Sequence, residues 1–235
     1  RPTLVQQWFS PSVCTDRRPN ASFKNMITVF SRVFGTTAVF FAVVFVVEAQ
    51  LPGTLSSDES RLKKATFAGG CFWCMEPPFD KLDGVISTTS GYIGGHVKDP
   101  TYKQVSAGIT GHAEAVEVLY DPMQVTYAEL LNIFWRNIDP LTRNRQFCDR
   151  GSQYRAGVFF HDSEQEHLAR DYKARLERSG RFGAPVVTEI VAALEFYPAE
   201  EYHQDYYKKH PVRYRVYRFG CGRDRRLDEI WGEPN

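Results

Sequence analysis

The sequence predicts an α/β protein in which helices pack on one mixed β-sheet. Runs of β-branched and apolar residues between positions 64 and 191 alternate with two segments that carry helix start signals. The chain has 235 residues, of which 43% are hydrophobic and 14% aromatic, so it can bury one sizeable core. Its formal net charge is only +1, which gives no strong field for attracting nucleic acid or an anionic membrane.

Five β-rich runs predict the strands of the sheet. The first, at residues 64–67, leads into Gly69 and Gly70. In the run 114–120, every second residue from Glu114 to Tyr120 shares one strand face, and Asp121 followed by a proline ends it. The other expected strands cover residues 84–89, 155–160 and 186–191.

Two segments predict helices. Thr126 and Glu129 have capping-box spacing and open a helix that continues through Ile138. Its apolar stripe consists of Leu130, Leu131, Phe134 and Trp135. Ser163 and Glu166 have the same spacing and open a second helix that ends near Gly180. No G-x-G-x-x-G or Walker-type loop accompanies these elements, so a nucleotide-binding fold is not expected.

The N-terminal region reads as a leader rather than as part of the folded domain. Residues 1–25 show no periodicity and precede Met26, so we interpret them as a non-native or untranslated upstream segment. From Met26 the chain carries one positive charge, then an uncharged run at 33–47 and small residues ending at Ala49. This pattern predicts a secretory signal peptide over residues 26–49, since a membrane-spanning helix needs about 20 apolar residues.

The remainder is predicted to be a polar linker at residues 50–62 and one domain at residues 63–235. We therefore expect an exported protein, periplasmic or secreted, rather than a cytoplasmic or membrane-anchored one. Cleavage after Ala49 would remove Cys14 and leave Cys71, Cys74, Cys148 and Cys221.

The segment with the clearest chemistry is the C-x-x-C pair of Cys71 and Cys74. A strand-to-helix turn presents free N–H groups and the positive end of a helix dipole, which favour a thiolate. Cys71 is therefore predicted to be a nucleophile at the exposed entrance of the helix. Because Pro77 and Pro78 fit best in a first helical turn, we expect the helix to begin near Met75 or to be kinked.

Several interpretations of these cysteines remain open on composition alone. Zinc would need a second pair at ligand spacing, and Cys148 and Cys221 are isolated, so no metal site is predicted. A thiol–disulfide oxidoreductase could use Cys71 and Cys74 directly. A non-catalytic exported binding module could instead form two structural disulfides, with no free thiol.

The chain resembles the A-type peptide methionine sulfoxide reductases in a series of ordered segments from about residue 65 to residue 203. These segments are GCFW at 70–73, SGYIGG at 90–95, PTY at 100–102, GHAEA at 111–115, DRGSQYR at 149–155 and FYPAEEYH at 196–203. The resemblance implies a ferredoxin-like, two-layer α+β plait and makes residues 63–235 the catalytic domain. It also implies reduction of methionine S-sulfoxide, free or in proteins, with the oxygen passing to a cysteine as sulfenic acid.

The resemblance assigns a role to each matching residue. Cys71 is the expected nucleophile and Glu114 the acid, whose apolar strand face should raise its pKa. The other expected members of the site are the hydrogen-bond donors Tyr102 and Tyr154, the supporting Asp149, and the methyl-pocket residues Phe72 and Trp73. By contrast, Tyr92, His112 and His203 are expected to belong to the scaffold.

The sulfenic acid must condense with a second thiol before a reductant can open the resulting disulfide. Cys74 stands where the commoner family pattern has glycine, so the recycling route departs from that pattern. We expect Cys221, in a glycine-flanked and mobile segment, to resolve in preference to Cys74, and Cys148 to be a buried, unreactive thiol. Thioredoxin or a related dithiol donor is the expected reductant. We expect no metal, organic cofactor or nucleic-acid partner, and we expect the protein to be a monomer.

Overall fold

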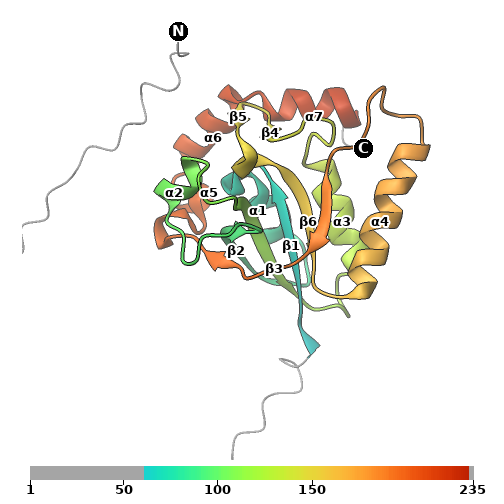
Figure 1. Cartoon of the computed structure of the whole chain (residues 1–235), viewed down its shortest axis with the longest axis horizontal. Coiled ribbons are helices and arrows are strands. Elements are labelled where there is room, and N and C mark those ends of the chain that lie inside the picture. The colour runs from blue at the N-terminus through green and yellow to red at the C-terminus, as the bar shows by residue number, and fades with distance from the viewer. Residues whose placement is uncertain (1–60, 233–235) are drawn as a thin grey trace, which may run out of the picture. The chain divides into compact units, whose positions relative to one another are not determined.

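A six-stranded sheet forms the centre of the fold in the computed structural model, which describes residues 61–232 (Figure 1). The strand order is β7-β6-β1-β3-β2-β8. Neighbouring strands are antiparallel except β6 and β7, which are parallel, so the predicted mixed sheet is confirmed. The strands are β1 (Lys63–Gly69), β2 (Val85–Ile93), β3 (Ala113–Tyr120), β6 (Ala156–Phe160), β7 (Glu189–Ala192) and β8 (Tyr197–Pro198). A separate two-stranded hairpin pairs β4 (Arg145–Gln146) with β5 (Asp149–Arg150).

The central elements follow the ferredoxin-like order. In sequence they run β1, α1 (Phe72–Asp80), β2, β3, α3 (Tyr127–Arg136) and β6, while in space the strands are ordered β6-β1-β3-β2. This is the β-α-β-β-α-β plait that the family resemblance implies. A longer helix, α4 (Ser163–Arg178), then connects β6 to its parallel neighbour β7.

The two faces of the sheet differ in the size of their side chains. On the helix-covered face, the ring of Phe67 stacks 5.2 Å from Phe79 and 5.1 Å from Phe134. The opposite face buries a smaller cluster of Ala68, Ile93, Ala113, Ala115 and Phe159. Because side chains alternate along a strand, Glu114 lies on the same face of β3 as Val116, toward α1.

Most of the expected elements are present, with changes at their ends. The capping box of α3 is confirmed, since the Glu129 carboxylate accepts from Thr126 N at 2.8 Å and Thr126 Oγ1 accepts from Glu129 N at 3.3 Å. Helix α4 begins at Ser163 as expected, but Asp162 caps it in place of Ser163, by accepting from Gln165 N at 2.8 Å. The last predicted strand begins at Glu189 rather than at residue 186.

The sequence patterns did not reveal the short elements and the C-terminal helices. These are α2 (Tyr102–Ser106), η3 (Ser152–Tyr154), η4 (Glu201–His203), α5 (Tyr206–Lys209), α6 (Pro211–Gly220) and α7 (Arg223–Trp231). Gly222 has φ +66°, a left-handed conformation that lets the chain turn from α6 into α7. The buried Arg223 then ties α7 to the core by donating to Asn137 O at 2.7 Å and Gly69 O at 3.2 Å. The expected mobile segment around Cys221 is therefore a helix junction.

Several predictions concern residues outside the described range. They are the upstream segment 1–25 with Cys14, the signal peptide 26–49 and the linker up to residue 60. Within residues 61–232, none of the helices combines the length and the apolar character that crossing a membrane requires.

Gly70 is the joint between β1 and α1. Its φ of +83° is a conformation that residues with a Cβ rarely adopt. A Cβ added there would lie 2.5 Å from Gln146 Cβ. Gln146 has little freedom to move away, because its side-chain amide accepts from Asp139 N at 2.9 Å and donates to Asp139 O at 2.7 Å. Both the backbone and the packing therefore favour glycine at this joint.

Gly180 provides a matched control, with φ +67° and no atom within 4 Å of an added Cβ. We expect Gly180→Ala to lower the free energy of unfolding by about 1–2 kcal/mol, the cost of the backbone conformation. Gly70→Ala should lower it by about 2–5 kcal/mol, since overpacking is added. Urea unfolding of both variants measures the difference, and equal losses would show that Gln146 does not constrain the joint.

Candidate active site

Cys71 lies at the N-cap of α1, directly after Gly70. Cys74 N donates to Cys71 O at 3.0 Å and closes the first turn, so the helix begins at Phe72 and not near Met75. Cys71 is only 6% exposed and Cys74 1%. The expected exposed entrance is therefore wrong, because aromatic side chains of the C-terminal segment, such as Tyr206 and Tyr217, pack over this turn.

The two thiols differ in acidity. Burial raises the pKa of Cys71 well above its ordinary value, and the hydrogen bond with Cys74 raises it further. The same hydrogen bond lowers the pKa of Cys74 to about 7, helped by the positive charges of Arg223 and Arg218. Burial therefore favours the protonated form of Cys71, whereas the sequence predicted a thiolate. Cys71 holds its proton, and Cys74 is the more acidic thiol.

Glu114 reaches the same turn from β3. Its side chain is 1% exposed, and its Oε2 accepts a hydrogen bond from Phe72 N at 3.2 Å. Burial raises the pKa of this carboxyl well above its ordinary value of 4.5, in the expected direction. Glu114 is thus a buried acid, attached to the backbone amide that immediately follows the candidate nucleophile.

Tyr102 and Tyr154 approach this acid from α2 and η3. Burial raises the pKa of both phenols, and the charges of Glu114 and Cys71 add to the shift. Both hydroxyls therefore keep their protons at neutral pH, and neither hydrogen-bonds to another residue in the range 61–232. Asp149 lies nearby, where its Oδ2 accepts from the Tyr217 hydroxyl at 2.6 Å. Residues far apart in sequence thus bring two phenol hydroxyls and two carboxyl groups to the candidate site.

Aromatic rings form one side of the candidate site. Trp73 stacks on Tyr206 with ring centroids 3.7 Å apart and donates from Nε1 to His203 Nδ1 at 3.0 Å. Burial lowers the pKa of His203 to about 4, so its ring is neutral near pH 7. Phe72 is only 1% exposed, whereas Trp73 is partly exposed. Of the two residues expected to hold a methyl group, Trp73 therefore offers the accessible surface.

Comparison with known proteins identifies the family. The family model described as peptide methionine sulfoxide reductase matches residues 63–235. The chain belongs to this family, as an A-type member. It is 51% identical over 171 residues to the peptide methionine sulfoxide reductase MsrA of Bacillus licheniformis, covering 73% of this chain and 94% of that protein.

A longer relative and two solved structures agree with this assignment. The MsrA/MsrB protein of Vibrio cholerae is 46% identical over 207 residues, and the match covers 86% of this chain but only 55% of that protein. Reduced Mxr1 from Saccharomyces cerevisiae has a TM-score of 0.61 at 36% identity, covering 66% of this chain and 89% of that one. Methionine sulfoxide reductase A of Corynebacterium diphtheriae has a TM-score of 0.59 at 33% identity, covering 65% and 76%.

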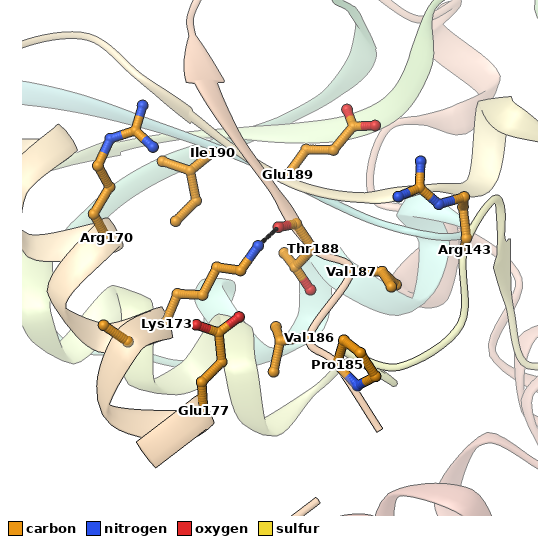
Figure 2. A pocket seen from close by; sticks show the side chains of 11 residues that line it. Arg143, Arg170, Lys173, Glu177, Pro185, Val186, Val187, Thr188, Glu189 and Ile190 are labelled. Carbon is orange, nitrogen blue, oxygen red and sulfur yellow. Dashed lines mark hydrogen bonds between the residues drawn. The ribbon is translucent and has the colours of Figure 1, made fainter. Parts of the chain in front are cut away.

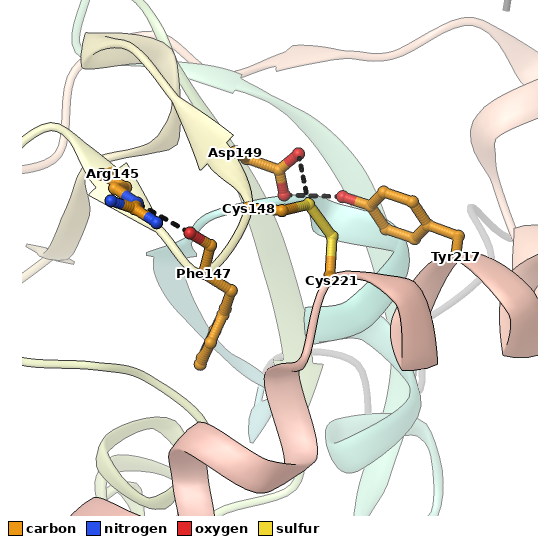
Figure 3. Close-up of a disulfide and its surroundings, with 6 residues drawn as sticks. All are labelled: Arg145, Phe147, Cys148, Asp149, Tyr217 and Cys221. Carbon is orange, nitrogen blue, oxygen red and sulfur yellow. Dashed lines mark hydrogen bonds between the residues drawn. A yellow bond between two sulfur atoms is a disulfide. The ribbon is translucent and has the colours of Figure 1, made fainter. Parts of the chain in front are cut away.

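The cysteines of this reductase domain fall into two pairs. Cys71 and Cys74 are free and buried, whereas Cys148 and Cys221 form a disulfide (Figure 3). The expectation that Cys148 is a buried thiol is wrong, because Cys148 is exposed and bonded. The rival interpretation of two structural disulfides is also wrong, since Cys71 and Cys74 are free.

A group of possible metal ligands surrounds this disulfide. The ligand atoms of Cys148, Asp149 and Cys221 lie within 4.8 Å of one another. Because the two sulfur atoms are bonded to each other, neither can act as a thiolate ligand in this state. Within the described part of the chain, this group is the only such cluster of three or more potential ligands.

Sequence reasoning missed residues that support the site from the C-terminal segment. Glu200 accepts from Tyr92 Oη at 2.8 Å and from Tyr102 N at 2.9 Å, and so holds Tyr102 against β2. His203 was expected to be a satisfied scaffold residue, yet its buried Nε2 has no hydrogen-bond partner in residues 61–232. The high frequency of tyrosine after residue 201 was the sequence feature that could have predicted these aromatic contacts.

A cavity of about 650 Å³ lies elsewhere, between α4 and the region of β7 (Figure 2). Lys173 crosses it and donates to Thr188 O at 2.9 Å. Arg143, Arg170 and Glu177 also line it, but no residue of the predicted site does. This cavity is therefore not the candidate active site.

Proposed function

We propose that this chain reduces methionine sulfoxide by attack of Cys71 on the sulfoxide sulfur. The observation that carries the proposal is the buried, hydrogen-bonded carboxyl of Glu114 at the amide next to Cys71. A sulfoxide sulfur is electrophilic, but its oxygen gains negative charge during attack and must be protonated to leave. A neutral acid beside a thiol supplies both requirements of the reaction.

Each residue of the candidate site has a separate role in sulfoxide reduction. Glu114 donates its proton to the sulfoxide oxygen and takes up the thiol proton as the Cys71 sulfur attacks, so the charge in the site does not change. The free hydroxyls of Tyr102 and Tyr154 donate hydrogen bonds to the same oxygen. The sulfoxide becomes a thioether and Cys71 becomes a sulfenic acid, which balances the oxygen and both electrons.

The substrate is the S epimer of methionine sulfoxide, free or in damaged proteins. Its oxygen must face Glu114 and the two phenols while its S-methyl group lies on Trp73, since methyl and sulfur groups contact rings favourably. A pyramidal sulfoxide satisfies both contacts in one configuration only. The family resemblance supports the choice of the S epimer.

The proposal is tested with separated S and R epimers of N-acetyl-methionine sulfoxide and dithiothreitol as reductant. The full chain should consume the S epimer alone, and Cys71→Ser should consume neither. Methionine formation measured by chromatography decides the result. Consumption of neither epimer by the unmodified protein would instead favour a thiol–disulfide oxidoreductase that uses Cys71 and Cys74.

The acid role of Glu114 predicts a pH dependence. The active form is the protonated carboxyl, whose pKa is raised by burial, so activity is present below this pKa and lost as the pH rises through it. Glu114→Gln cannot give up a proton and should lower kcat/KM by roughly 10²–10⁴-fold. It should also abolish the alkaline limb that Glu114 causes.

Glu117→Gln is a suitable control, because Glu117 lies on the same strand and pairs with Lys64 at 2.9 Å on the surface. Steady-state rates from pH 5 to 10 for both variants provide the comparison. Activity of Glu114→Gln close to that of the unmodified protein would remove Glu114 from the mechanism.

We further infer that Cys74, and not Cys221, resolves the sulfenic acid in this disulfide-bonded form. Cys74 already hydrogen-bonds to Cys71, and its pKa of about 7 leaves much of it as thiolate at neutral pH. Cys221 is bonded to Cys148 and has no free thiol. Condensation of Cys74 with the Cys71 sulfenic acid releases water, and a dithiol donor of the thioredoxin type then reduces the new disulfide.

Blocking resolution should trap the intermediate. After reaction with one equivalent of sulfoxide, Cys74→Ser should accumulate Cys71 sulfenic acid, seen by mass spectrometry as a dimedone adduct. Cys221→Ser should instead contain a Cys71–Cys74 disulfide and no adduct. The reverse pattern would assign resolution to Cys221.

A further inference from the structure

Tyr217 links the C-terminal helix α6 to two members of the candidate site. Its hydroxyl donates to Asp149 Oδ2 at 2.6 Å. Its ring meets Trp73 edge to face, with centroids 5.7 Å apart. No sequence motif marks this tyrosine, yet it touches both the supporting carboxylate and the expected substrate-facing ring.

A covalent bond lies beside this hydrogen bond. Cys148 directly precedes Asp149 on the β4–β5 hairpin, and Cys221 follows Tyr217 by about one turn at the end of α6. Their disulfide has a Cα–Cα separation of 4.8 Å and joins positions 73 residues apart. Figure 3 shows that the disulfide and the Tyr217–Asp149 hydrogen bond run side by side between the hairpin and the helix.

The helix that carries Tyr217 contributes few buried side chains to the core. None of the residues of α6 is fully buried. Val212, Val216 and Phe219 are exposed by 67%, 68% and 86%. Elements with few buried apolar contacts open at low free-energy cost, so a cross-link at the end of α6 contributes strongly to keeping Tyr217 in place.

We propose that Tyr217 positions Asp149 beside Cys71 and that the Cys148–Cys221 disulfide keeps Tyr217 there, so that the redox state of this surface pair sets the rate of oxygen transfer. The inference rests on the proposed function of Cys71. Tyr217 is a positioning residue, since it acts through Asp149. Neither Cys148 nor Cys221 takes part in the oxygen transfer itself.

Asp149 is surrounded by groups that respond to its charge. Burial raises its pKa, whereas the Tyr217 hydroxyl and the charge of Arg223 lower it. Loss of the hydroxyl therefore raises the pKa of Asp149 and leaves it protonated up to a higher pH. The other titratable groups that its charge affects are Cys71 and Cys74 at α1, Glu114 on β3, Tyr102 on α2 and Tyr154 on η3.

The chemical step of the switch is thiol–disulfide exchange with the dithiol donor that the proposed function already requires. A donor thiolate attacks the sulfur of the exposed Cys148 and releases Cys221, and the second donor thiol then attacks this mixed disulfide and releases Cys148. Two electrons and two protons pass from the donor to Cys148 and Cys221. The sulfur–sulfur bond is lost, the donor becomes a disulfide, and α6 keeps only its non-covalent contacts with the hairpin.

The test measures the first turnover of the full chain without reductant, after mass mapping has verified the Cys148–Cys221 disulfide. Tyr217→Phe should form methionine roughly tenfold more slowly, as expected for loss of a hydrogen bond to a charged group. If ionised Asp149 supports the reaction, its protonation causes a loss of activity at low pH, and this loss should begin at a higher pH in Tyr217→Phe. Tyr172→Phe is the control, because the Tyr172 hydroxyl bonds to Asn132 at 2.8 Å on the surface of α3 and α4.

The disulfide is tested in the same assay. Cys148→Ser and Cys221→Ser should each slow the first turnover by about threefold or more, and Cys148→Ser should add nothing in a Tyr217→Phe background. Methionine is released before any resolving thiol acts, so a purely resolving Cys221 would not change this rate. If the unmodified protein forms no methionine, the proposed function fails. If the unmodified protein forms methionine and Tyr217→Phe forms it at the same rate, the positioning role of Tyr217 is overturned. If the cysteine variants are as fast as the unmodified protein, the role of the disulfide is overturned.

Discussion

The hydrogen bond from Phe72 N to Glu114 Oε2 is the constraint on which the rest of the site depends. It joins the first turn of α1 to the beginning of β3 and so fixes the distance between a thiol and an acid that lie far apart in sequence. Burial of this carboxyl raises its pKa and keeps it protonated, so no buried charge needs compensation. The sharp turn at Gly70 and the plait that places β3 beside β1 make the bond possible.

Local patterns predicted the layers of the fold better than its C-terminal segment. The alternation in β3 and the capping box at Thr126 depend on neighbouring residues, and both are present in the structure. Helix α6 buries no residue completely, so its sequence lacks a regular apolar stripe by which it could be recognised. Similarly, the family motif named the candidate site residues, but no spacing rule predicts that the distant Tyr206 stacks on Trp73 beside the buried Cys71.

The two cysteine pairs differ in solvent access and in bonding. Cys71 and Cys74 are almost completely buried, beside the rings that pack on Trp73. Cys148 is at the surface, bonded to Cys221 across the junction of α6 and the β4–β5 hairpin. Asp149 and Tyr217 connect these environments through one hydrogen bond. Chemistry at the buried pair and redox state at the exposed pair thus meet at a single carboxylate.

The high pKa of the buried Cys71 also affects its reactions with molecules other than its substrate. Peroxides and alkylating agents react with thiolates, so a thiol that keeps its proton beneath packed rings reacts with them slowly. In the mechanism that we propose, a sulfoxide differs because its own oxygen accepts the proton of Glu114, which then takes up the thiol proton. Proteins that repair oxidative damage work where oxidants are abundant. We therefore expect the burial that makes Cys71 a weak acid to slow its reaction with those oxidants.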